Sequence, residues 1–455
     1  MNAAYQDLLI RKKKMDLNCR DKVECNPHKN AKPHQADCLR KLLEVGTGAA
    51  FLDTGLGKTF LQLDWARHVP GDVLILAPLA VANQTVEEAG KLLGMNIHHS
   101  RDGQVKERIT ITNYERAHLF DVSSFNAVVL DESSILKGQS SKMRQWLTDA
   151  YQHTPWKLAC TATPAPNDHT ELGNHSQFLG IMNAQEMLTR WFIHDSANTA
   201  DWRLKGHAVK DFWSWVGSWS CCVSKPSDLG HSDEGYDLPN LHIETHVHNS
   251  PLVTDSADML FDMPSVAATD LHATRRSTID ERCRSVADMV NRSTEPWIVW
   301  CESNDESLML ASLIPDAVEV KGSQTIEQKE SRLDSFTNQD ARVLISKPKI
   351  CGFGMNWQHC RNMAFASISY SYEAFYQAVR RCWRFGQTEQ VNVHVCISDA
   401  EIPVWRVIER KTIDHDTMKR EMREAIGYSQ THDVKIDYNP RKNAVFPKWL
   451  KSENQ

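Results

Sequence analysis

The sequence has no hydrophobic run long enough to cross a membrane. Its longest apolar stretch, VLILAPLAVA at residues 73–82, contains a proline and falls well short of about 18 residues. No apolar segment follows the charged residues near the start, so we expect no signal peptide. These two absences predict a cytoplasmic chain that is neither membrane-bound nor secreted.

The twelve cysteines include no CxxC pair, which argues against a disulfide framework and suits reduced thiols in a cytosol. One cluster has spacings that loosely resemble a zinc site, although it matches no known finger. A metal site and ordinary thiols and imidazoles both remain open for its four residues, Cys25, His28, His34 and Cys38.

The chain also lacks a strong excess of charge of either sign. Its formal net charge is −6 and its isoelectric point is near 6.4, so any contact with nucleic acid must come from a local basic lining. A hydrophobic content of 41% and a charged content of 24% are those of a folded protein. The length of 455 residues predicts two or three domains, each with its own core.

Short apolar runs alternate with helical segments in the first half of the chain. Residues 57–69 and 80–93 have the apolar spacing of helices. Because strands that alternate with helices form parallel sheets, this half is predicted to be a parallel α/β lobe. The strands predicted for it are residues 49–54, 72–78, 108–113, 126–133 and 157–163.

Residues 171–224 differ, because they combine helical patterning with many tryptophans and few strand candidates. The aromatic side chains are explained more simply as a helical core than as a platform for stacking nucleic-acid bases. They are Trp191, Trp202, Trp213, Trp215 and Trp219.

Strand–helix alternation resumes after residues 225–241, which are rich in Gly, Pro, Asp and Ser and are predicted to be a linker. The later predicted strands are residues 297–301, 317–322, 342–347, 363–367 and 391–397. We therefore predict an α/β protein with two parallel-sheet lobes. Its domains are an N-terminal extension (1–30), a first lobe (31–170), a helical insertion and linker (171–235), a second lobe (236–428) and a peripheral tail (429–455).

The segment FLDTGLGKTF at residues 51–60 has the composition of a phosphate-binding loop. A glycine-rich turn between a strand and a helix exposes backbone N–H groups to phosphate oxygens. Gly55 and Gly57 allow this close approach, Lys58 would reach the β- and γ-phosphates, and the Thr59 hydroxyl would bind Mg²⁺. The general pattern has a glycine where this chain has Leu52, so a plain turn that caps a helix is the alternative.

The segment VVLDESS at residues 128–134 ends an apolar strand on two carboxylates. Opposite a phosphate loop, Asp131 would hold Mg²⁺ and Glu132 would position the attacking water. Thr161 and Thr163 follow the next predicted strand and are placed to hydrogen-bond this carboxylate loop, although a plain strand-ending turn explains them nearly as well.

Two arginines in QAVRRCWRFGQ, at residues 377–387, lie three positions apart. That spacing predicts one helical face for Arg381 and Arg384, and their guanidinium groups suit the charge of a transferring phosphoryl group. A site with its lysine in one lobe and its arginines in the other would open and close with each cycle.

The order of these motifs resembles that of the superfamily-two helicases, and most closely the Swi/Snf-type DNA-dependent ATPases. Residues 32–40 resemble the adenine-reading segment, residues 55–59 the first motif, residues 131–137 the DExx box and residues 161–172 the third motif. The fifth and sixth motifs, at residues 346–357 and 377–387, match at Gly352, Gly354, Asn356, Gln377, Arg381, Arg384, Gly386 and Gln387. The resemblance covers about residues 33–395.

This resemblance implies two RecA-like lobes with ATP and Mg²⁺ in the cleft between them, and duplex DNA running across both. It implies hydrolysis by Lys58, Asp131, Glu132, Arg381 and Arg384, with Mg²⁺ held by Thr59 and Asp131. It also implies nucleotide contacts from Gln35, Gly55, Gly57, Lys58, Thr59, Gly354 and Gln377. Ser133 and Ser134 stand at the end of the DExx box, where many relatives have a histidine. We therefore expect the ATP site to be coupled to DNA through different contacts.

Compact single-motor relatives resemble those of bacteriophages and mobile elements. The expected partners are therefore DNA and a nuclease, a methyltransferase or a replication protein in a bacterial host cell, with no membrane. Candidate DNA contacts are Lys137, Lys347, Lys349, the backbone at Asn356 and a stacking Trp357. The basic run at residues 11–14 is more simply a solvated helix face.

Three alternatives remain beside a DNA translocase or helicase. One is an ATP-gated DNA-binding subunit of a methylation or restriction complex, and another is an RNA helicase. The third is a metal-dependent nuclease, suggested by Asp316, Glu319 and Lys321, whose carboxylates lie too close along the chain to come from two neighbouring strands. A surface strand of the second lobe explains these three residues better.

Overall fold

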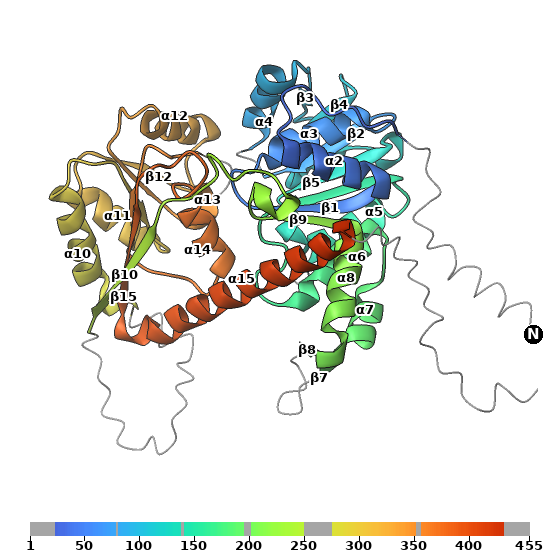
Figure 1. The fold of residues 1–455 in the computed structure, drawn as a ribbon. Helices are drawn as coiled ribbons and strands as arrows, with labels where there is room; N and C mark the ends of the chain where they lie inside the picture. Colours follow the sequence, from blue (N-terminus) through green and yellow to red (C-terminus); the bar gives the residue numbers. More distant parts are fainter. Residues whose placement is uncertain are drawn as a thin grey trace, which may run out of the picture.

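The computed structural model describes residues 23–78, 81–137, 141–194, 202–249, 275–351 and 356–431. Within these residues the chain forms two α/β lobes that stand side by side (Figure 1). Every strand pairing inside the two large sheets described is parallel, as the sequence predicts.

The first lobe has a seven-stranded sheet with the order β3-β4-β2-β5-β6-β1-β9. Its five longer strands are fully buried, because helices cover the sheet, and they confirm the five predicted runs. The strands are β1 (Thr47–Leu52), β2 (Val73–Ala77), β3 (His98–His99), β4 (Ile109–Asn113), β5 (Ala127–Asp131), β6 (Trp156–Thr161) and β9 (Ser220–Val223).

Helices of the first lobe begin where the sequence places its turn residues. Pro33 opens the first described helix, and Gly57 precedes the second in a left-handed conformation. The helices are α2 (Pro33–Val45), α3 (Lys58–His68), α4 (Ala82–Glu88) and α5 (Lys142–Ala150), with a π-turn η1 (Ala89–Leu93) and 3₁₀ turns η2 (Tyr114–Leu119), η3 (Val122–Ser124) and η4 (Ser133–Leu136).

The predicted helical insertion contains helices, but it also contributes a strand to the sheet of the first lobe. β9 pairs with β1, and it was missed because its four residues, SCCV, are short and carry no alternation. The other elements are η5 (His169–Glu171), α6 (Leu172–Leu179), α7 (Ala184–Trp191), the hairpin β7 (Phe192–His194) and β8 (Trp202–Leu204), η6 (Gly206–Ala208), α8 (Val209–Trp219) and η7 (Pro226–Leu229).

The tryptophans of this region form a core, as predicted. Trp191, Trp213, Trp215 and Trp219 are each at most 8% exposed, and Trp215 packs on both Trp191 and Trp219. Trp202 is half-buried and stacks on His194. A base-stacking platform is therefore wrong for the four buried rings, because their faces are already covered.

The second lobe has a six-stranded sheet with the order β10-β15-β14-β11-β13-β12. The five predicted strands are confirmed, and a sixth, β10, follows the predicted linker. The strands are β10 (Leu241–His248), β11 (Trp297–Trp300), β12 (Ala317–Val320), β13 (Val343–Ser346), β14 (Asn362–Phe365) and β15 (Val391–Ser398). The helices are α10 (Ile279–Asn291), α11 (Asn304–Leu313), α12 (Ile326–Thr337), α13 (Pro348–Cys351) and α14 (Tyr372–Val379), with η8 (Asp399–Glu401).

One long helix, α15 (Ile402–Thr431), joins the two lobes. Figure 1 shows it running from the second lobe to α8 and β9 of the first. Val404 and Ile408 belong to the core of the second lobe, whereas Met418 and Met422 are buried in the core of the first. Glu421 also accepts a hydrogen bond of 2.6 Å from the indole Nε1 of Trp213. α15 therefore fixes the lobes against each other.

None of the helices that the structure describes combines the length and the apolar composition needed to span a bilayer.

The residues behind the nuclease alternative lie on or beside β12, an edge strand. Asp316 forms an ion pair with Arg342, while Glu319 forms one of 2.8 Å with Lys321 and accepts a hydrogen bond from Ser307. These partners support the assignment of a surface strand in the second lobe.

Candidate functional site

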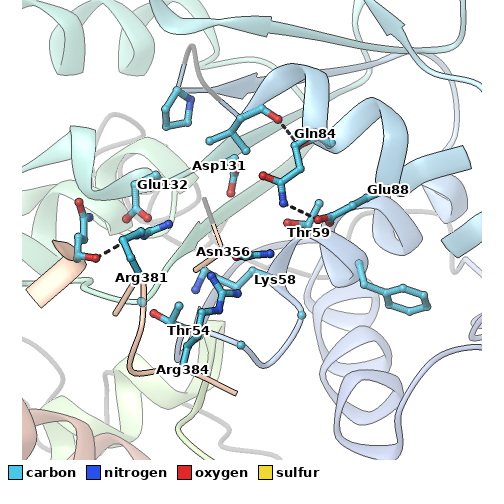
Figure 2. A pocket seen from close by; sticks show the side chains of 18 of the residues that line it. Thr54, Lys58, Thr59, Gln84, Glu88, Asp131, Glu132, Asn356, Arg381 and Arg384 are labelled. Carbon is cyan, nitrogen blue, oxygen red and sulfur yellow. Dashed lines mark hydrogen bonds between the residues drawn. The ribbon is translucent and has the colours of Figure 1, made fainter. Parts of the chain in front are cut away.

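A cleft between the lobes is lined by residues from both. Its empty volume is about 1040 Å³, counting the part that is open to solvent. Figure 2 shows side chains from the two lobes pointing into the same space. Of the predicted site residues, the cleft is lined by Gly55, Gly57, Lys58, Thr59, Asp131, Glu132, Gln377, Arg381 and Arg384, together with Asn356 of the fifth motif.

The loop between β1 and α3 forms the floor of this cleft. Gly55 and Gly57 have φ angles of 94° and 79°, which a residue with a Cβ rarely adopts. A Cβ at Gly55 would also lie 2.6 Å from the Cβ of Phe385 in the second lobe. Both glycines are therefore required by the backbone, and the loop touches the opposite lobe directly.

Lys58 begins α3 and is partly buried against the loop, where its Nζ donates a hydrogen bond of 2.9 Å to the carbonyl of Leu52. Burial lowers the pKa of Lys58 to about 8, although the carboxylates of Glu132, Asp53 and Asp131 oppose that shift. An anion placed in the cleft would restore the lysine's full charge, because a nearby negative charge favours the protonated form.

Asp131 and Glu132 stand at the carboxyl end of β5, facing Lys58 across the cleft (Figure 2). Burial, helped by the neighbouring charge of Glu132, raises the pKa of Asp131 to about 7. The hydroxyl of Tyr114 donates a hydrogen bond of 2.7 Å to the Asp131 carbonyl. A cation would therefore find a buried carboxyl group whose charge it can stabilise.

The backbone of Glu132 has a φ angle of 60°, in the left-handed region that a residue with a side chain rarely enters. One carboxylate oxygen, Oε1, accepts hydrogen bonds of 2.5 Å from Thr161 and 3.1 Å from Ser134. The predicted contact between Thr161 and the carboxylate loop is thus confirmed. The Thr163 backbone N–H donates to the Thr161 hydroxyl at 3.0 Å, which extends the chain of contacts. Strain of about 1 kcal/mol or more and two hydroxyl donors hold Glu132 in one orientation.

One of the two serines at the end of the DExx box contacts a histidine from another element. Ser133 Oγ lies 3.1 Å from Nε2 of His175 on α6. His175 is fully buried and packs edge-on against Phe51 of β1. An imidazole is therefore present behind the carboxylates, supplied 42 positions later in the chain.

His175 predicts a loss of stability in mild acid. Burial lowers its pKa to about 4, whereas an unfolded histidine has a pKa near 6.5. The unfolded state therefore binds a proton first, so the free energy of unfolding should fall by about 2 kcal/mol between pH 7 and pH 5 on account of this group. Urea titrations at both values should show that His175→Gln removes this part of the pH slope, while His153→Gln, at an exposed site, retains it. Equal slopes in all three proteins would show that His175 titrates normally.

The two predicted arginines reach the cleft from a turn and not from a helical face. α14 ends at Val379, so the prediction of one helical face is wrong. The Arg380 N–H still makes the helical hydrogen bond to the Tyr376 carbonyl, whereas the N–H groups of Arg381 and Cys382 donate to carbonyls three residues back. Gly386, at the end of the turn, has a φ of 91°. Arg381 is buried and its Nε donates to the Gln377 carbonyl at 3.0 Å.

Burial weakens the protonation of both arginines. The pKa of Arg381 falls to about 10 through burial, with the charge of Glu132 opposing the fall. The pKa of Arg384 falls to about 9 through burial and through repulsion from Arg381 and Arg380. The cleft thus holds several cationic groups close together, an arrangement that a polyanion would stabilise.

Sequence reasoning missed a cluster beside the loop between β1 and α3. Asp53 forms an ion pair with Lys419 of α15 and accepts a hydrogen bond of 3.0 Å from the Tyr376 hydroxyl. Arg380 donates to the Thr54 carbonyl at 3.1 Å. No sequence motif joins residues 53 and 419, so only the docking of α15 reveals the pair. Gln84 and Glu88 of α4, which share a hydrogen bond of 2.7 Å, also line the cleft unpredicted.

Removing Lys419 should destabilise the packing of the two lobes. The side chains of Lys419 and Asp53 are 8% and 15% exposed, so Lys419→Met leaves a buried carboxylate without its cation. The expected loss is about 3 kcal/mol in the free energy of unfolding, measured by chemical denaturation. Arg410→Met, at an exposed position of the same helix, is the control. If Lys419→Met unfolds with the same denaturant midpoint as the wild type, the ion pair contributes no net stability.

Gln35 lies below the phosphate loop and does not line the cleft. Its Nε2 donates to the Leu56 carbonyl at 3.0 Å and its Oε1 accepts from the Lys32 backbone at 2.9 Å. A Cβ at Gly57 would come within 2.2 Å of this amide, so Gln35 packs directly against the loop. Its contact with adenine stays a prediction. Gly352, Gly354 and the basic run at residues 11–14 lie outside the described residues.

The structure corrects one expected DNA contact. Trp357 is fully buried in the second core and donates from Nε1 to Thr337 at 3.1 Å, so it is not available to stack on a base. Lys137 of the first lobe forms an ion pair with Glu373 of the second, while Lys347 donates to Asn304 at 2.8 Å. Lys349 is exposed.

The loose zinc cluster does not converge in the structure. Cys38 contacts Cys221, and the His34 imidazole lies 3.3 Å from the Leu56 carbonyl and against Tyr236. Among the described residues, these four are not brought within reach of one ion. Ordinary core thiols and imidazoles therefore explain them.

Comparison with known proteins gives two matches. Residues 281–386 match the family described as helicase conserved C-terminal domain. The chain is also 26% identical over 167 residues to a Halobacterium salinarum protein named "Putative DNA 3'-5' helicase Rad25". That match covers 34% of this chain and 27% of the relative, so the chain spans about a quarter of the relative's length. Together the matches show that part of the second lobe is similar to the C-terminal domain of helicases and that the chain has a distant likeness to a protein named a DNA helicase.

Proposed function

We propose that this protein is an ATP-dependent DNA translocase or helicase of the Swi/Snf type, which hydrolyses ATP to move along or remodel duplex DNA. The observation that carries the proposal is a single cleft where Lys58 of the first lobe meets Arg381 and Arg384 of the second. Asp131 and Glu132 complete the same cleft. A polyphosphate bound there would contact both lobes at once, which is what a cycle of opening and closing requires.

The residues of the cleft fit ATP and Mg²⁺. Gly55 and Gly57 adopt positive φ angles, and a Cβ on them would clash with Phe385 and Gln35, so only glycine allows this turn, whose backbone N–H groups would face phosphate oxygens. Arg381 is a buried cation and Lys58 and Arg384 are partly buried ones, and the pKa values of all three are lowered, so each gains from an anion. In this proposal Lys58 holds the β- and γ-phosphates, while Gln35 and Gln377 support the nucleotide from either lobe.

The chain's own carboxylates have separate tasks in the proposed reaction. Asp131, with the hydroxyl of Thr59, would hold Mg²⁺, which supplies positive charge to the phosphates when bound. Glu132 orients the attacking water, and the hydroxyls of Thr161 and Ser134 keep its carboxylate aimed. The charge that builds up on the phosphoryl group is stabilised by Arg381 and Arg384.

Duplex DNA is the proposed track because the motif order resembles DNA-dependent ATPases and because the Halobacterium relative is named a DNA helicase. The partner would be a nuclease, a methyltransferase or a replication protein. An ATP-gated DNA-binding subunit differs from this proposal in having no movement along DNA, and an RNA helicase differs in its track.

The test is steady-state ATP hydrolysis by the purified chain without nucleic acid and with single-stranded DNA, duplex DNA or RNA. Strong stimulation by duplex DNA, followed by displacement of the third strand from a DNA triplex, is the expected result. If only RNA stimulates hydrolysis, the protein moves along RNA and the proposal of duplex DNA is wrong. If duplex DNA stimulates ATP hydrolysis but the third strand is not displaced, the ATP-gated DNA-binding subunit is favoured. The Lys58→Ala variant, measured in parallel, controls for contaminating ATPases.

A further inference from the structure

The edge strand β10 has an unusual row of side chains. In its sequence LHIETHVH, residues 242, 244, 246 and 248 alternate with the others, and they are His, Glu, His and His. Because successive side chains of a strand point to opposite faces, these four share one face of the sheet. The row lies at one edge of the second lobe, because β10 has no neighbouring strand on its outer side in the described sheet.

The neighbouring strand adds a fourth imidazole to this face. β10 and β15 are parallel, and Glu244 lies opposite His394 in their register. His246 Nε2 is 3.1 Å from His394 Nδ1. A carboxylate oxygen of Glu244 lies 3.5 Å from that Nδ1 and 3.9 Å from His246 Nε2. Three potential ligand atoms therefore form a small triangle, all within 4.8 Å of one another.

We propose that Glu244, His246 and His394 form a binding site for a transition-metal ion of the Zn²⁺ class. Zinc–ligand bonds of about 2.0–2.1 Å in a tetrahedral site put neighbouring ligand atoms about 3.3 Å apart. The two shorter sides of the triangle, 3.1 and 3.5 Å, bracket this spacing. Two imidazoles with one carboxylate are a donor set that zinc accepts, whereas Ca²⁺ and Mg²⁺ prefer oxygen ligands.

The surroundings hold one ligand in place and leave another free to adjust. The His394 ring stacks on Trp297 with centroids 5.7 Å apart and planes 30° apart. The Glu244 side chain is 52% exposed, so it can close by the few tenths of an ångström that the longest side requires. Its exposure also leaves room for a water molecule as the fourth ligand.

A bound ion would tie β10 to β15 through their side chains. β10 follows the linker and pairs with β15 alone in the described sheet. The edge of the second lobe would then depend on the metal, and the site is separate from the nucleotide cleft, because none of its three ligands lines that cleft.

The experiment uses the full chain, stripped with a chelator and freed of nucleotide. Zn²⁺ is titrated by calorimetry, and Co²⁺ is added separately to follow its visible absorption. The wild-type protein should bind one more Zn²⁺ than His246→Ala and His394→Ala, and its melting temperature should rise with Zn²⁺ where theirs does not. His118→Ala, at an exposed position of the first lobe, is the matched control and should bind like the wild type.

Equal Zn²⁺ stoichiometry in the wild type and in both ligand variants would overturn the proposal. If either variant folds poorly, Glu244→Gln provides a milder test, because it keeps the shape of the exposed side chain. The proposal then requires a weakened Zn²⁺ affinity of at least tenfold and a changed Co²⁺ spectrum, and an unchanged spectrum would contradict it.

Discussion

Glu132→Gln is expected to lower the turnover number for ATP by about 10²- to 10⁴-fold, with nucleotide affinity retained. The amide keeps the size of the side chain and its contacts with Thr161 and Ser134, but it has no negative charge with which to polarise water. Because the lost interaction belongs to the transition state, the effect should fall on kcat and leave nucleotide binding intact. Turnover is measured in the presence of duplex DNA, and affinity by titration with a fluorescent nucleotide.

Glu107→Gln is the matched control for this variant, since Glu107 is exposed and lies on the same lobe outside the cleft. It should retain wild-type turnover. If Glu132→Gln hydrolyses ATP at the wild-type rate, another group must orient the water, and the role given to Glu132 is wrong.

Arg384→Ala is expected to reduce kcat by about 10³-fold or more, the scale found when an arginine that stabilises phosphoryl transfer is removed. Binding should change less, because Lys58 and the loop glycines still contact the phosphates from the first lobe. The variant has a second readout: Arg384 is one of the groups that lower the pKa of Lys58, so the resting pKa of Lys58 should rise above about 8.

Arg361→Ala controls for loss of positive charge on the second lobe. Arg361 is 36% exposed and forms ion pairs with Glu295 and Glu389 at the surface, so its loss should leave kcat unchanged. Unchanged turnover in Arg384→Ala would remove this arginine from the site, whereas loss of nucleotide affinity alone would make it a ground-state contact.

The strands were predictable because buried parallel strands are short, continuous apolar runs, and this signal is local. All ten predicted runs, five in each lobe, appear as strands. β9 and β10 were not predicted, and the reasons differ. β9 is four residues long inside a helical stretch, while β10 has a polar row of histidines where a core strand would have apolar residues.

The cleft was predictable to the extent that its residues belong to contiguous motifs. Lys58, Asp131 and Glu132 lie at the carboxyl ends of strands, where parallel sheets bring loops together. The conformation around the arginines was not predictable, because the helix pattern continues past the point at which α14 ends. His175 and Lys419 could not be found at all, since their contacts with Ser133 and Asp53 join distant parts of the chain and depend on packing.

The position of α15 has a consequence for how the protein is made. A ribosome completes both sheets by residue 398, but Lys419, the cation beside the phosphate loop, is added only afterwards. Until then Asp53 is a carboxylate without that lysine, and the first-lobe core lacks Met418 and Met422. The unfinished chain therefore has both halves of the cleft between the lobes without the helix that fixes them together. Synthesis order thus delays assembly of the complete cleft until α15 has been made.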